Sequence, residues 1–134
     1  MSIKLICGVS RAGKTTYSQQ FDNVIHLDEA ARTGKRYEAV NNHVSKIITD
    51  ITVEGIYDKA SARIDLLNSY HGTGGKICIF IDPTEEEIKS RPWVKRHGGY
   101  YRKHEFEPPT YDEGWDEIWI RRNDEERLLE KGGD

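Results

Sequence analysis

Residues 8–15 read Gly8-Val9-Ser10-Arg11-Ala12-Gly13-Lys14-Thr15 and fit the pattern G-x-x-x-x-G-K-[ST]. An apolar run of strand length, Ile3 to Cys7, precedes this pattern, and the residues from Lys14 to Phe21 read as the start of a helix. A strand, a glycine loop and a helix in that order are the context that a phosphate-binding loop requires. The sequence therefore predicts a site for the phosphates of a nucleotide.

Each part of this loop predicts a separate role. Gly8 and Gly13 let backbone N–H groups turn toward phosphate oxygens, aided by the partial positive charge at the start of a helix. Lys14 would reach the β- and γ-phosphates, and the hydroxyl of Thr15 would bind Mg²⁺. ATP and Mg²⁺ are thus the expected cofactors. The remaining residues expected to contact ATP are Ser10, Arg11, Ala12 and Thr16.

Length and composition limit the kind of protein. With 134 residues, 36% of them hydrophobic and 32% charged, the chain is expected to form one polar domain over residues 1–134. No apolar run approaches the length of a membrane span or a signal peptide, so no membrane partner and a cytoplasmic location are expected. Cys7 and Cys78 lie in apolar runs, which favours reduced, buried thiols over a disulfide or a metal site. The sequence indicates no oligomeric state.

Along the rest of the chain, apolar runs of strand length alternate with segments whose apolar residues have helical spacing. Residues 23–27, 51–53, 76–81 and 116–120 read as strands, and residues 35–48 and 58–70 have helical spacing, with Asp58 as a possible cap. Alternating strands and helices predict an α/β fold with a parallel sheet and right-handed crossovers. The charged stretch from Asn123 to Asp134 is expected to form a short helix around residues 125–130 with a frayed end.

Two acids follow predicted strands directly. Ligand groups gather at the carboxyl ends of strands in open α/β sheets, so Asp28 is a candidate catalytic residue, although it could equally cap the next helix. Arg32 lies one helical turn later and could pair with Asp28 or bind a substrate anion. Glu54 follows the strand at 51–53 and could orient a Mg²⁺-bound water beside the phosphate loop.

A basic segment follows the strand at 76–81. Residues 89–104 contain six Lys or Arg residues and no acid, in a chain whose formal net charge is −3. A net negative charge argues against indiscriminate nucleic-acid binding, but it leaves a local basic site open. The segment's position predicts a lid whose arginines close over the transferred phosphate; the alternative is a solvated basic helix. The arginines concerned are Arg91, Arg96 and Arg102.

Taken together, these features resemble the kinase domain of polynucleotide 5′-hydroxyl kinases. The residues that carry the resemblance are the loop from Gly8 to Thr15, Asp28, the pair Arg91 and Arg96, and above all the segment Phe106-Glu107-Pro108-Pro109-Thr110-Tyr111-Asp112-Glu113-Gly114-Trp115-Asp116-Glu117-Ile118. This last segment is similar to a phenylalanine, proline and Glu-Gly-aromatic motif near the end of the kinase domain of polynucleotide kinase-phosphatases.

The resemblance implies a P-loop NTPase fold with a five-stranded parallel sheet, flanking helices and an arginine-bearing lid at about residues 89–104. It implies transfer of the γ-phosphate of ATP to a 5′-hydroxyl of DNA or RNA, with nucleic acid as the partner. Asp28 matches the general base, and Arg96 matches the lid arginine, with Arg91 beside it. Arg32 approximates an arginine that binds the substrate phosphate, and Arg102 is expected to join it in binding substrate.

Other acceptors stay open. No phosphatase domain accompanies the predicted kinase, and the segment between the second and third predicted strands leaves few residues for a long nucleic-acid channel. The acceptor could instead be a modified-base hydroxyl in DNA, a nucleoside or nucleotide, or a small metabolite. A hypothesis of a different class is an ATP-binding switch or assembly module without an acceptor.

Overall fold

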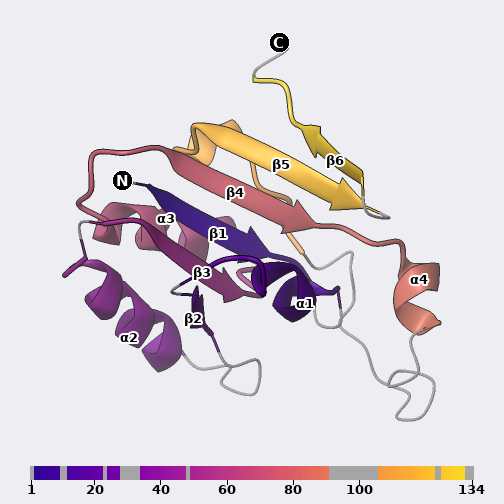
Figure 1. The fold of residues 1–134 in the computed structure, drawn as a ribbon, viewed down its shortest axis with the longest axis horizontal. Helices are drawn as coiled ribbons and strands as arrows, with labels where there is room; N and C mark the ends of the chain where they lie inside the picture. Colours follow the sequence, from indigo (N-terminus) through magenta and orange to yellow (C-terminus); the bar gives the residue numbers. More distant parts are fainter. Residues whose placement is uncertain are drawn as a thin grey trace.

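The computed structural model of the protein describes residues 2–9, 12–22, 24–27, 34–47, 49–90, 106–122 and 125–131. At its centre is a six-stranded sheet with the strand order β2-β3-β1-β4-β5-β6 (Figure 1). The pairs from β2 to β5 are parallel, and β6 is antiparallel to β5. The predicted α/β fold with a parallel core sheet is therefore confirmed. The strands are β1 (Ile3–Cys7), β2 (Val24–His26), β3 (Ile51–Gly55), β4 (Lys76–Ile81), β5 (Glu117–Arg122) and β6 (Glu125–Leu128).

The central strands are apolar because both faces of the sheet are covered. Every residue of β3 is buried, as are four of the five residues of β1 and the last four of β4. Strands in such a position read as nearly continuous hydrophobic runs rather than as alternating ones. This accounts for the clear strand signal of Ile3–Cys7 and Lys76–Ile81 in the sequence.

Helices lie around this sheet (Figure 1). In the described part of the chain the helices are α1 (Lys14–Ser18), α2 (Gly34–Val44), α3 (Ala60–Ser69), α4 (Glu85–Lys89) and the 3-10 helix η2 (Tyr111–Glu113). α2 and α3 pack against each other, and α1 contacts β1 and β3 at the carboxyl edge of the sheet. α4 lies beyond the carboxyl end of β4 (Figure 1). Thr84 and Glu87 form a capping box at the start of α4.

The start of α3 differs from the expectation. Its N-cap residue is Lys59, which makes no side-chain cap hydrogen bond. The N–H of Ala60 donates instead to Oε1 of Glu107 at 3.0 Å. A carboxylate from a distant segment therefore supplies the cap that the sequence assigned to Asp58, since the fold brings residue 107 to this helix end.

The segment at 106–118 is anchored to the core. Phe106 is buried and stacks on Phe80 of β4 with ring centroids 5.1 Å apart. Glu113 is buried and accepts hydrogen bonds from Nε and Nη2 of Arg63 at 2.7 and 2.9 Å. Nε1 of the buried Trp115 donates to the same carboxylate at 3.0 Å. The segment thus fastens α3 to β5.

The prediction of a short helix around residues 125–130 was wrong. Residues 125–128 form the strand β6, whose register pairs Trp119 with Leu128 and Arg122 with Glu125. All four residues of β6 are exposed. An alternation of charges gives no apolar period, so the pairing with β5, which the linear pattern does not show, decides between strand and helix. Among the described residues, no helix has the length and apolar character needed to cross a membrane.

Candidate active site

The phosphate loop joins the carboxyl end of β1 to α1. A Cβ atom at Gly8 would lie 2.6 Å from the backbone oxygen of Ile81, so the chain passes β4 too closely for any side chain. Gly13 has φ of 106°, a left-handed conformation that glycine adopts without strain. Two glycines of the pattern are therefore required by the backbone path itself.

The side chain of Lys14 is held within this loop. It is 2% exposed, and Nζ donates to the backbone oxygen of Val9 at 2.7 Å. The N–H of Ala12 donates to the same oxygen at 3.1 Å. A buried ammonium needs such partners because desolvation of a charge is costly. The loop accordingly presents a localised positive charge at the carboxyl edge of the sheet.

A carboxylate lies beside the loop, at the end of the neighbouring strand. Oγ1 of Thr15 donates to Oε1 of Glu54 at 2.9 Å. Glu54 is 2% exposed, and Nδ1 of the half-exposed His26 lies 3.4 Å from the same oxygen. The register pairs Ile6 with Glu54, so the parallel pairing of β1 and β3 brings the acid to the loop. The result is a hydroxyl and a carboxylate next to an ammonium-bearing loop.

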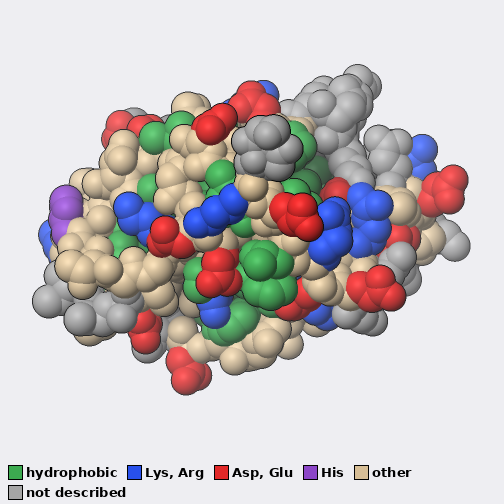
Figure 2. All heavy atoms as spheres, turned by 90° about the horizontal axis from the view of Figure 1, so that it is seen from above, with side chains coloured by type: hydrophobic (Ala, Val, Ile, Leu, Met, Phe, Trp, Pro, Cys, Tyr) green, Lys and Arg blue, Asp and Glu red, His purple; other side chains and the backbone are tan. Residues whose placement is uncertain are grey.

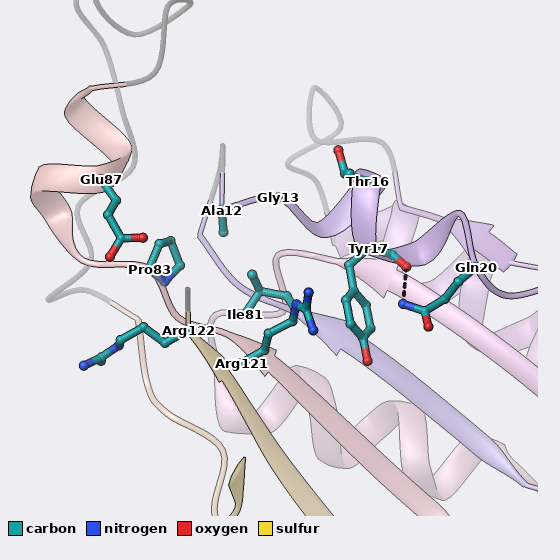
Figure 3. Close-up of a pocket in the computed structure, with 10 residues that line it drawn as sticks. All are labelled: Ala12, Gly13, Thr16, Tyr17, Gln20, Ile81, Pro83, Glu87, Arg121 and Arg122. Carbon is teal, nitrogen blue, oxygen red and sulfur yellow. Dashed lines mark hydrogen bonds between the residues drawn. The ribbon is translucent and has the colours of Figure 1, made fainter. Parts of the chain in front are cut away.

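A pocket with a volume of about 450 Å³ opens beside the loop (Figure 3). Small-molecule sites typically have volumes of about 300–1,000 Å³. Its walls come from the loop and α1, from the β4–α4 connection and from the end of β5. The lining residues are Ala12, Gly13, Thr16, Tyr17, Gln20, Ile81, Pro83, Glu87, Arg121 and Arg122.

One wall of this pocket combines an aromatic ring with a cation. Cζ of Arg121 lies 4.8 Å from the centroid of the Tyr17 ring. Figure 3 shows the two side chains beside each other. The hydroxyl of Tyr17 and Nη1 of Arg121 both donate to Oε1 of Glu126 at 2.8 Å. Burial and the hydrogen bond to Glu126 raise the pKa of Tyr17 to about 12, so the phenol stays protonated near neutral pH. This wall therefore offers a flat, partly cationic surface to a ligand.

The structure brings part of the predicted site together. Lys14, Thr15 and Glu54 meet at the carboxyl edge of the sheet, and Ala12, Gly13 and Thr16 line the adjacent pocket. The others lie outside the described residues, so their placement stays a prediction: Ser10, Arg11, Asp28, Arg32, Arg91, Arg96 and Arg102, together with most of the lid at about 89–104.

Three residues that line the pocket were not predicted from the sequence: Tyr17, Arg121 and Arg122. Arg121 and Arg122 end β5, and the rule that selected Asp28 and Glu54 at strand ends also applies to them. Tyr17 lies one helical turn after Lys14, a spacing that places both side chains on neighbouring parts of α1. Glu126 carried no such signal because its position depends on the pairing of β6 with β5.

Solved structures give the comparison with known proteins. A gluconokinase from Sinorhizobium meliloti 1021 matches with a TM-score of 0.67 and 16% identity, over 90% of this chain and 82% of that one. A sugar kinase from Janibacter sp. HTCC2649 matches with a TM-score of 0.65 and 16% identity, over 91% and 85% of the two chains. No protein-family model and no curated protein sequence matches the chain.

The predicted nucleic-acid partner is wrong. The two similar structures are named as kinases of gluconate and of a sugar, not of nucleic-acid ends. The segment at 106–118, which carried most of the resemblance to polynucleotide kinases, uses Phe106, Glu113 and Trp115 to bind the chain's own core. Figure 2 shows Lys and Arg side chains interspersed with Asp and Glu over the described part of one face. What the comparisons do show is that the chain has the fold of P-loop kinases.

Proposed function

We propose that the protein is an ATP- and Mg²⁺-dependent phosphotransferase whose acceptor is a hydroxyl of a small metabolite. The observation that supports it most is the hydrogen bond of Thr15 to Glu54 at the carboxyl edge of the sheet, beside the loop that holds Lys14 and next to an open pocket. Nucleotide phosphates need a cationic loop, and the nucleoside needs a cavity next to it. The loop and the pocket both lie at the carboxyl edge of the sheet.

The residues at this edge fit a Mg²⁺ ion. Oγ1 of Thr15 and Oε1 of Glu54 are hard oxygen donors 2.9 Å apart. Mg²⁺ in phosphate sites is held by one or two protein oxygens and by the phosphates of the substrate. Within the described residues no group of three or more His, Cys, Asp and Glu could hold a metal ion. Thr15 and Glu54 would therefore hold the ion together with ATP; when bound, Mg²⁺ neutralises charge on the β- and γ-phosphates.

Each protein group then has a defined task. Lys14 exchanges its bond to Val9 for the phosphates and balances the charge that develops on them. Gly8 and Gly13 allow the backbone to approach the phosphates closely. The Tyr17 and Arg121 wall packs against the nucleoside. Asp28, which follows β2 in the sequence, accepts the proton of the acceptor hydroxyl, and Arg91 and Arg96 cover the transferred phosphate.

The acceptor is proposed to be a polyhydroxylated small molecule such as a sugar or a sugar acid. The names of the two similar kinases support this class. Arg32 and Arg102 then serve to bind an acidic group or hydroxyls of the acceptor. An acceptor of this size requires no extended basic groove.

A labelling experiment tests the proposal. The protein is incubated with γ-labelled ATP, Mg²⁺ and a panel of gluconate, hexoses, pentoses, polyols and nucleosides, and labelled product is sought. Lys14→Ala should abolish transfer, whereas Lys46→Ala, at an exposed position after α2, should not. Asp28→Asn should bind ATP but lose transfer. ATP binding without any labelled product would overturn the kinase assignment in favour of a binding module, and an active Lys14→Ala protein would overturn the assignment of the loop.

A further inference from the structure

Glu126 lies outside the pocket yet contacts two of the residues that line it. Its Oε1 accepts from the hydroxyl of Tyr17 in α1 and from Nη1 of Arg121 in β5, each at 2.8 Å. The register pairs Arg121 with Glu126 across the antiparallel ladder, so both side chains leave the same face. A single carboxylate oxygen on the edge strand thus joins the helix of the phosphate loop to the end of β5.

This contact adds a constraint on two side chains of the pocket wall. The side chains of Arg121 and Glu126 keep 27% and 35% of their surfaces exposed. Arginine loses considerable rotamer freedom when held in one position, and a partly exposed ion pair of this kind adds little to global stability. Its effect is therefore expected in the local geometry of the pocket wall rather than in the stability of the fold.

We propose that Glu126 is a positioning residue that preorganises the nucleoside side of the ATP site. By holding the Tyr17 ring and the Arg121 guanidinium 4.8 Å apart, it fixes the wall against which the nucleoside packs. The inference rests on the proposed function, since it assigns that pocket to the nucleotide. It makes the edge strand β6 a determinant of nucleotide affinity.

Nucleotide binding and turnover in a set of variants test this. Glu126→Ala should weaken ATP binding, measured by calorimetry, by about 3–10-fold and raise KM for ATP by a similar factor, while kcat changes by less than about 2-fold. Glu126→Gln keeps an oxygen that accepts from both partners, so it should restore most of the affinity. Glu130→Ala removes an equal charge at an exposed position beyond β6 and should leave binding unchanged.

A double-mutant cycle separates positioning from a general effect of charge. If Glu126 acts through the ring, Tyr17→Phe combined with Glu126→Ala should weaken binding by less than the product of the two single effects. Melting temperatures of all variants should stay within about 3 °C of the parent. Parent affinity in Glu126→Ala, or equal losses in Glu126→Ala and Glu130→Ala, would overturn the inference. A parent protein that binds no ATP would instead overturn the proposed function.

Discussion

The ion pair of Arg63 and Glu113 gives the sharpest prediction about the fold. Arg63 is fully buried, and the side chain of Glu113 is 3% exposed. Oε1 of Glu113 accepts from Nε of Arg63 and from Trp115, and Oε2 accepts from Nη2 of Arg63 and from the N–H of Thr110. Nη1 of Arg63 donates to the backbone oxygen of Tyr57 at 2.7 Å. Burial alone would lower the pKa of Arg63, but the hydrogen bonds and charge of Glu113 raise it, so the guanidinium stays charged.

Glu113→Gln preserves shape but removes the charge. Whichever position the new NH₂ group takes, it faces two donors, so two hydrogen bonds are lost and the buried guanidinium has no counter-charge. Removing one partner of a buried pair costs about 3–5 kcal/mol. For a chain of 134 residues this corresponds to a fall in melting temperature of about 10 °C or more.

Urea and thermal unfolding measure this loss. Glu117→Gln is the matched control, because Glu117 accepts from the Trp119 indole in the same i to i+2 relation but at an exposed position. It should change stability by less than about 0.5 kcal/mol. Replacing Arg63 and Glu113 together by Met and Leu should recover much of the loss, since no charge then remains buried. A loss below about 1 kcal/mol for Glu113→Gln would refute the idea that this pair anchors the 106–118 segment.

Three further predictions concern the loop, a helix cap and the metal site. Gly8→Ala should weaken ATP binding at least about 10-fold, because its Cβ would meet the Ile81 oxygen at 2.6 Å, whereas Gly75→Ala, with its nearest atom at 4.0 Å, should not. The cap hydrogen bond from the first amide of α3 lowers the pKa of Glu107 below its usual 4.5, so its contribution is present above that pH and lost as the pH falls through the lowered value. Glu107→Gln should therefore lower the melting temperature at pH 7, and the difference from the parent should shrink below pH 4.5; a difference independent of pH would contradict this. Glu54→Gln should raise the Mg²⁺ concentration for half-maximal transfer about 10–100-fold, and an unchanged Mg²⁺ dependence would exclude Glu54 from the metal site.

The sequence was most informative where local pattern and environment agree. β1 and β4 are buried on both faces, so their apolar runs marked them clearly. The loop between β1 and α1 could be recognised because its glycines, Lys14 and Thr15 lie within one short stretch of chain, although the close approach to Ile81 that requires Gly8 is visible only in the structure. The segment at 106–118 was wrongly interpreted as a nucleic-acid kinase motif, because a segment that anchors the core and a ligand-binding motif use similar residue types.

The donor half of the site can be predicted from local sequence: a strand, a glycine loop, Lys14 and Thr15 indicate where phosphates are expected, since these features lie within one short stretch of chain. Which distant residues contact that stretch depends on how the chain folds. Parallel pairing brings Glu54 to Thr15, and antiparallel pairing of β6 brings Glu126 to Arg121 and Tyr17. Those contacts depend on strand order and register, which arise from packing of the whole sheet and leave no periodic trace in the residues concerned.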